Sequence, residues 1–152
     1  MQCIEGRFIF LNLKNYMFEV NYVAVLVAGI INLILGMVWY APRVFGGAWM
    51  RMSKITPEMA ERGKRRMPLM AFIAFIAGVI MAYVLSFFAI AWGVFDAIGA
   101  LDVAFWIWLG FIAPVLLGSV LWEQKPMKLY VINAGYWLVS LVVMLQILLL
   151  MA

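Results

Sequence analysis

The sequence predicts an all-α, polytopic membrane protein: a four-transmembrane-helix bundle with a short amphipathic helix in its first cytoplasmic loop. The first observation is composition, since 68% of the 152 residues are hydrophobic and 12% are charged, whereas soluble domains carry about 25% charged residues. The second is that the apolar residues collect in four stretches, at residues 21–40, 67–92, 103–122 and 129–152. About 20 helical residues cross a hydrocarbon core of about 30 Å, and a spanning helix bonds its own backbone groups internally. Each stretch is therefore predicted to be one span.

The first residues differ in character from the rest of the chain. Residues 1–17 mix charged side chains with a short apolar run and lack the order of a signal peptide, in which a basic start precedes an apolar region and small residues. We expect an N-terminal leader, interfacial or disordered, followed by a single transmembrane domain over residues 18–152. The one cysteine, Cys3, is expected to be inert. Met17 is a second candidate start of translation, and the choice between it and Met1 stays open.

The connection between the first two spans has its own predicted structure. Pro42 is expected to end the first span because proline cannot continue a helix, and the glycine pair at 46–47 is expected to form a flexible turn. Residues 56–58 form a helix start, with a threonine N-cap, a proline at the first helical position and a carboxylate in the first turn. We expect a short helix over residues 57–64 that lies along the membrane surface, apart from the second span.

Positive charges predict the orientation. The first loop holds seven Lys and Arg residues and the third loop holds two, whereas residues 93–102 hold none. Short loops rich in Lys and Arg stay in the cytoplasm. We expect a multi-pass protein of the plasma or inner membrane, with the first and third loops cytoplasmic and both termini outside.

A basic cluster stands directly before the second span, at Lys64, Arg65 and Arg66. Anionic headgroups of the cytoplasmic leaflet attract such residues by about 1 kcal/mol each. The predicted partners are therefore the lipid bilayer and anionic lipid headgroups on the cytoplasmic side, and not a nucleic acid. A homo-oligomer is also expected, because four helices enclose little space.

Two spans carry packing signals. Ala74, Gly78 and Ala82 are spaced four apart in the second span, a stripe of small residues that allows another helix to approach closely. Pro114 stands in the middle of the third span, where it removes a backbone hydrogen bond and is expected to kink or loosen the helix.

The residues that usually carry chemistry are missing. The chain has no histidine, the commonest ligand of several metals, and it has neither a nucleophile–histidine pair nor a Gly-rich phosphate loop. We therefore expect no enzyme, no metal and no cofactor. No charged residue lies well inside a span, which argues against a proton-coupled transporter or a pump. Asn32 and Asn133 either bond one helix to another or belong to a ligand site.

The candidate ligand site lies at the predicted cytoplasmic ends of the spans. Asn133 and Tyr136 share a face of the fourth span, and Glu123 is the carboxylate nearest to that half of the bundle. A half-polar pocket there would suit an amphipathic ligand whose cationic or hydroxylated head meets Glu123. The alternative is that the tryptophans anchor the interface and the carboxylate is solvated. The candidate residues are Trp39, Tyr40, Trp122, Glu123, Asn133 and Tyr136.

Several of these residues also carry a resemblance to a known family. The segments at 21–28 and 39–50, together with Trp122-Glu123 and the segment at 130–136, resemble the bacterial domain-of-unknown-function family 1761. The resemblance covers roughly Phe18 to the C-terminus and implies membership without an activity. Such families usually show Ser where Ala41 stands, so a role for that hydroxyl would be lost here. The resemblance makes these positions better candidates for the shared role: Trp39, Tyr40, Pro42, Phe45, Gly46, Trp49, Trp122, Glu123, Asn133 and Tyr136.

Two classes of function stay open. The sequence favours a structural or interaction protein, which would be an oligomeric bundle or a small partner subunit. The alternative is an oligomeric transporter or channel for a small or amphipathic molecule. A polar, water-filled axis lined by Asn32 or Asn133 would favour transport, and a dry bundle would favour the structural role.

Overall fold

The computed structural model describes residues 20–152, so the predicted leader and Cys3 lie outside the described residues. All regular structure within residues 20–152 is helical. Four helical segments are long and apolar enough to cross a membrane: Tyr22–Met52, Pro57–Ala91, Ala97–Leu121 and Met127–Leu150. The predicted fold class, all-helical with four candidate spans, is confirmed.

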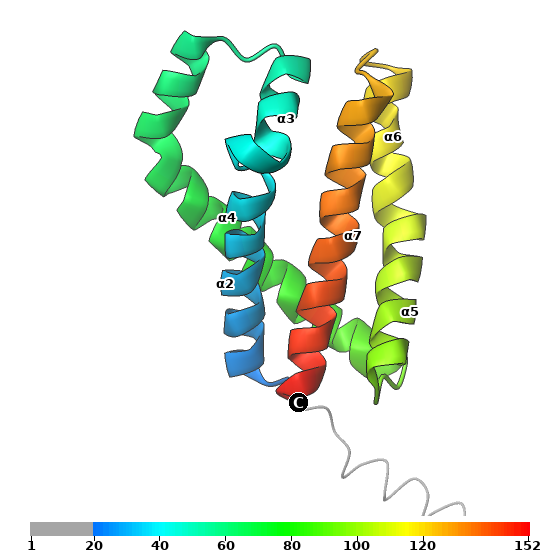
Figure 1. The fold of residues 1–152 in the computed structure, drawn as a ribbon. Helices are drawn as coiled ribbons and strands as arrows, with labels where there is room; N and C mark the ends of the chain where they lie inside the picture. Colours follow the sequence, from blue (N-terminus) through cyan, green and yellow to red (C-terminus); the bar gives the residue numbers. More distant parts are fainter. Residues whose placement is uncertain (1–19) are drawn as a thin grey trace, which may run out of the picture.

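The four spans do not pack as equivalent parallel helices. Helix α2 (Tyr22–Trp39), helix α7 (Met127–Leu150) and the segment that holds α5 (Ala97–Ile107) and α6 (Ala113–Leu121) run side by side, while α4 (Pro57–Ala91) crosses them obliquely (Figure 1). The α3–α4 and α6–α7 connections lie at one end of the molecule, here named the basic end. The α4–α5 connection and the C-terminus lie at the other, here named the opposite end (Figure 1).

Helix α2 ends just before Pro42, as predicted, but the helical segment continues beyond it and the glycines have a different role. Helix α2 stops at Trp39, and a π-helical turn, η1 (Pro42–Gly46), leads directly into α3 (Gly47–Met52). The predicted flexible turn is wrong, since Gly46 and the residue after it both have right-handed helical backbone angles. Gly46 is needed for space instead, because a Cβ atom there would lie 2.0 Å from the carbonyl oxygen of Tyr40.

The basic segment before the second span belongs to that span. Thr56 caps α4 as predicted, since its Oγ1 accepts from the backbone N–H of Met59 at 3.3 Å. The predicted separate helix over residues 57–64 is wrong, because α4 runs without a break to Ala91 with Pro68 inside it. Lys, Arg and Met are good helix formers, and they carry the helix through Pro68 at the cost of one backbone bond. The axis of α4 changes direction along its length (Figure 1).

The third span begins earlier than its hydropathy suggests and is loosened where its proline predicts. The Asp96 side chain accepts from Gly99 N–H at 2.8 Å and starts α5 at Ala97. A π-helical turn, η2 (Trp108–Ile112), separates α5 from α6, and Pro114 follows it. Since Pro114 lacks an N–H, the wider turn relieves the local mismatch in backbone bonding.

The tightest packing lies toward the opposite end. Small residues let α2 and α4 approach there: a Cβ atom at Gly29 would lie 2.7 Å from Cγ2 of Val79. A Cβ atom at Gly78 would lie 3.1 Å from Nδ2 of Asn32. The core cluster draws residues from all four spans: Ala24, Val25, Ala28, Ala82, Leu85, Ala100, Val103, Ala104, Leu141, Met144, Leu145 and Leu148.

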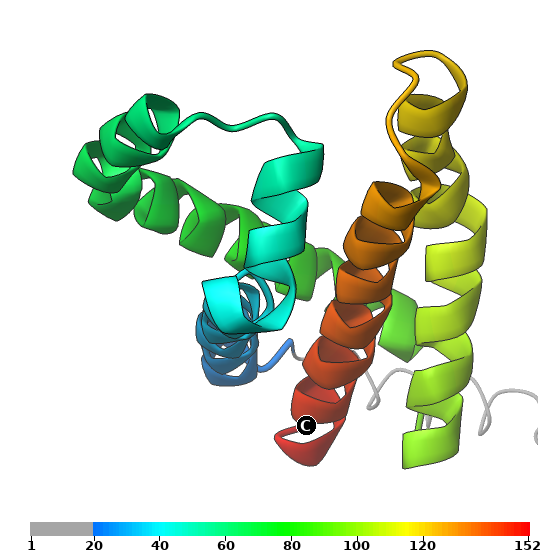
Figure 2. The ribbon, with the colours of Figure 1, turned by 45° about the horizontal axis from the view of Figure 1, so that its top comes forward.

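The predicted stripe of small residues on α4 divides between two surroundings. Gly78 and Ala82 are buried, and Gly78 faces α2. Ala74, one turn closer to the basic end, is exposed and lines a cleft. The N-terminal half of α4 stands away from α7 (Figure 2). Helices that pack closely at one end and diverge at the other leave a space between them.

Candidate ligand site

A cluster of hydrogen-bonded polar side chains joins α2 to α7. Tyr136 Oη donates to Oδ1 of Asn32 at 3.3 Å, and the buried Ser140 Oγ donates to the same oxygen. Nearer the basic end, Tyr40 Oη donates to Oδ1 of Asn133 at 3.0 Å. We name these five residues the polar cluster. In lipid, bonds of this kind are worth about 0.6 to 2 kcal/mol each, so the cluster fixes α2 against α7.

Aromatic rings surround the polar cluster. The Tyr136 ring lies 5.3 Å from the Tyr40 ring and 6.2 Å from that of Trp39, centroid to centroid. Trp49 of α3 stands edge-on to Tyr40 at 5.6 Å. Gly36 makes room for the assembly, because a Cβ atom there would lie 3.1 Å from Tyr136 Oη. The break between α2 and α3 therefore brings Trp49 of α3 against Tyr40, whose ring in turn packs on Tyr136 of α7.

Two indoles hold α7 from two other spans. Trp39 Nε1 donates to the carbonyl oxygen of Ile132 at 3.2 Å, and Trp108 Nε1 donates to that of Ala134 at 2.8 Å. A spare lone pair on a helical carbonyl can accept such a second bond. Trp39 is thus more than an interfacial anchor, since it fixes the end of α2 on α7.

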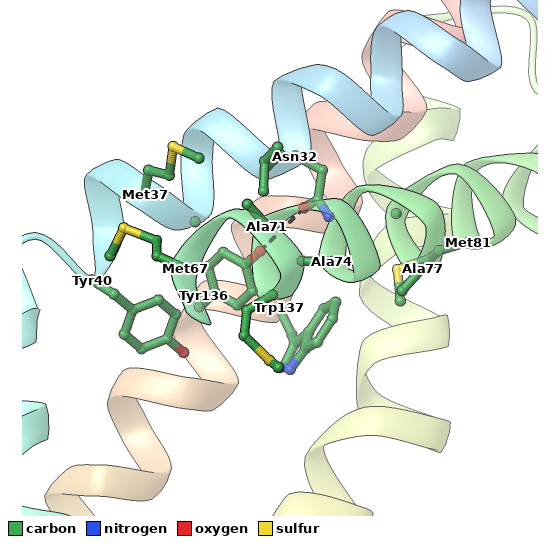
Figure 3. A pocket seen from close by; sticks show the side chains of 14 residues that line it. Asn32, Met37, Tyr40, Met67, Ala71, Ala74, Ala77, Met81, Tyr136 and Trp137 are labelled. Carbon is green, nitrogen blue, oxygen red and sulfur yellow. Dashed lines mark hydrogen bonds between the residues drawn. The ribbon is translucent and has the colours of Figure 1, made fainter. Parts of the chain in front are cut away.

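The cleft beside the polar cluster has a volume of about 490 Å³ and lies between α2, α4 and α7. Figure 3 shows Tyr40, Met37 and Met67 toward one end of it and Ala77 and Met81 toward the other. Its walls are mostly apolar, with several methionines, which adapt their shape to what they contact. The lining residues are Asn32, Leu33, Gly36, Met37, Tyr40, Met67, Met70, Ala71, Ala74, Ala77, Gly78, Met81, Tyr136 and Trp137.

A family model matches residues 23–149, which include most of every span. The model is described as a protein of unknown function, DUF1761. The chain belongs to the DUF1761 family. Neither a curated protein nor a solved structure matches this chain.

Four of the six residues proposed from the sequence come together in this DUF1761 protein, and two lie elsewhere. Trp39, Tyr40, Asn133 and Tyr136 belong to the cluster or to its ring of aromatics. Trp122 is 85% exposed. The Glu123 carboxylate pairs with Lys125 at 2.6 Å, and both side chains are about half exposed. Within residues 20–152, no hydrogen bond or ring contact joins Trp122 or Glu123 to the polar cluster.

Other members of the site were not among the proposed residues. Asn32 is absent from the six candidate residues, although the sequence leaves open whether it bonds one helix to another or belongs to a ligand site, and Ser140 is not a candidate either. The spacing of Tyr136 and Ser140 could have indicated this site. Residues four apart on α7 lie on the same face of the helix, so both can reach one partner on α2. The methionines of the cleft were also missed, although Met67, Met70 and Met81 recur at helical spacing.

The polar groups at the DUF1761 site are hydroxyl and amide groups that form hydrogen bonds. The described residues contain no group of His, Cys, Asp or Glu side chains that could hold a metal ion. The donor hydrogens of Tyr40 and Tyr136 are directed at asparagine oxygens, which leaves lone pairs of the phenol oxygens as acceptors. The cleft therefore offers a long apolar wall and a few hydrogen-bond acceptors.

Proposed function

We propose that this DUF1761 protein is a membrane-embedded binding protein, without enzymatic activity, that holds an amphipathic molecule in the cleft between α2, α4 and α7. The cleft itself carries the proposal: its volume of about 490 Å³ falls within the range of about 300–1,000 Å³ typical of ligand pockets. Its apolar walls suit a hydrocarbon chain, and the acceptors of the polar cluster suit a hydroxylated group.

The polar cluster supports binding over conduction. Asn32 and Asn133, the two residues that would line a polar path, both accept hydrogen bonds from tyrosines. An aqueous path needs polar groups that remain available to water or to an ion. A purely structural or interaction role, which the sequence favours, makes a different prediction: protein, such as a second copy, would then fill the cleft.

A photoactivatable probe tests this function. We expect a monoacylglycerol with a diazirine in its chain, added to the protein in nanodiscs, to label Met67, Met70 and Met81 in preference to residues of α4 that do not line the cleft. Ala74→Trp should reduce this labelling at least fivefold, because the indole would fill the cleft. Mass spectrometry of the labelled peptides gives the readout.

The matched control places the same bulk on the other side of the helix. Ile73 is 52% exposed and does not line the cleft, so Ile73→Trp should leave the labelling unchanged. Equal labelling of Leu69, Ile73 and the methionines, or equal effects of the two tryptophan variants, would contradict the proposal.

The orientation belongs to the proposal as well. We propose that the basic end faces the cytoplasm, because nine basic residues are found there and residues 93–102 contain none. Cysteines placed at Asp96 and at Lys125, with Cys3 replaced by serine, should react with an impermeant thiol reagent from opposite sides of intact cells. Reaction of both from the same side would refute the charge argument.

A further inference from the structure

We infer that the cleft takes an anionic glycerophospholipid, with one acyl chain along α4 and the phosphate held by Lys64 and Arg66. This rests on the proposed function and adds the class of ligand and the residues that select it. The occupant is argued from the continuity of α4, from the position of its charges and from the length of the cleft.

The continuity of α4 sets the positions of the charges relative to the cleft. Lys64 lies three residues before Met67, and Arg66 lies four before Met70; both methionines line the cleft. Residues three or four apart are neighbours on a helix surface. The two cations therefore stand at the sides of the cleft-lining face, one turn closer to the basic end.

Arg65 differs from its two neighbours. Its neighbour one turn along is Leu69, which is 57% exposed and does not line the cleft. At about 100° per residue, Arg65 points away from the line of residues that runs from Met67 to Met81. Lys64 also pairs with Glu61 at 2.9 Å, but its side chain remains 69% exposed and can still meet a phosphate.

The dimensions of the cleft suit one acyl chain. From Met67 to Met81, at about 1.5 Å per residue, α4 covers about 21 Å. One leaflet contributes about half of a hydrocarbon core of about 30 Å, and α4 runs obliquely (Figure 1). An acyl chain that follows this oblique wall from its Met67 end has its headgroup at the basic end.

Charge complementarity selects the headgroup. The basic end carries nine Lys and Arg residues against three glutamates, whereas residues 92–102 carry only two aspartates. A phosphate bearing one net negative charge is favoured there, while a zwitterionic headgroup brings a cation that offsets the gain. Each basic residue near a phosphate is worth about a fivefold change in affinity.

The test uses phosphatidylglycerol and phosphatidylcholine with identical acyl chains. Native mass spectrometry of the purified full chain, released from detergent at rising lipid concentration, gives an apparent Kd for the first lipid bound. We expect phosphatidylglycerol to bind at least tenfold more tightly. Arg66→Gln should weaken it about fivefold and Lys64→Gln with Arg66→Gln about thirtyfold, while Arg65→Gln, which removes the same charge, should change it less than twofold.

Ala74→Trp separates failure of this inference from failure of the proposed function. If Ala74→Trp abolishes binding of both lipids but Arg66→Gln and Arg65→Gln weaken phosphatidylglycerol equally, the cleft binds amphipaths and the selective role of Lys64 and Arg66 is refuted. If Ala74→Trp leaves both lipids bound as in the unsubstituted chain, the cleft is not the site and both proposals fail. If Ala74→Trp converts a dimer to a monomer, a second copy occupies the cleft and this inference also fails.

Discussion

Gly29→Leu is expected to separate α2 from α4 and to lower the stability of the protein by about 3 kcal/mol. A Cβ atom at this position would lie 2.7 Å from Cγ2 and 3.2 Å from the backbone nitrogen of Val79. The backbone of α4 cannot move aside as a flexible side chain can, so the helices must separate. Overpacking a well-packed site costs about 1–3 kcal/mol. Separating α2 from α4 at Gly29 also reduces the contact between these helices further along, so we expect a cost at the upper end of that range.

For a chain of this size the effect corresponds to a decrease in Tm of roughly 6–12 °C. Thermal unfolding in a mild detergent, followed by circular dichroism, measures it. Gly110→Leu is the matched control, because nothing lies within 4 Å of a Cβ atom at that glycine. The close α2–α4 packing would be refuted if both leucine variants melted at the same temperature as the unsubstituted protein.

Asn32→Ala is the second substitution with a large expected effect, a destabilisation of about 2 kcal/mol. Oδ1 of Asn32 accepts from both Tyr136 and Ser140. Ser140 is fully buried, and after the substitution its hydroxyl keeps only the sulfur of Met144, at 3.8 Å. The substitution removes two interhelical hydrogen bonds worth about 0.6–2 kcal/mol each. It also leaves the buried Ser140 donor poorly paired, and together these losses account for the expected destabilisation.

Asn133→Ala provides the comparison, because it removes one hydrogen bond, from the half-buried Tyr40. We expect it to cost less than half as much. Stability against denaturing detergent gives both values, and combining Asn32→Ala with Ser140→Ala should give less than the sum of the single effects. Strict additivity of this pair would show that Ser140 and Asn32 act independently.

Local sequence patterns predicted the four spans and the start of α4. Hydropathy over about 20 residues identifies a span without knowledge of its neighbours, and the Thr56 cap acts within one turn of its own helix. The Asp96 cap is equally local but was not predicted, because the third span was expected to begin at residue 103. The loosening before Pro114 is equally local, because the missing N–H belongs to that residue.

What the sequence did not predict depends on partners that lie far apart in the chain. Asn32 and Ser140 are separated by 108 positions, and a single sequence does not show which polar residues of two spans face each other. Glu123 was favoured because it stands near the inner half of the bundle, yet Lys125 in the same loop pairs with it. The sequence also did not predict that α4 continues through Pro68. Proline tends to end a helix, but strong helix formers on either side can override this tendency.

The indole bonds from Trp39 and Trp108 to α7 also bear on how the protein is made. Helix α7 contacts all three other spans, whereas α5 makes few contacts with α4 and packs mainly on α7. Helix α7 is also the last of the four spans to leave the ribosome. The hairpin of α2 and α4 can therefore close during synthesis, while the third span must wait in the bilayer for its partner. During that interval the tryptophans that will hold α7 face lipid, so completion of the bundle is coupled to insertion of its final span.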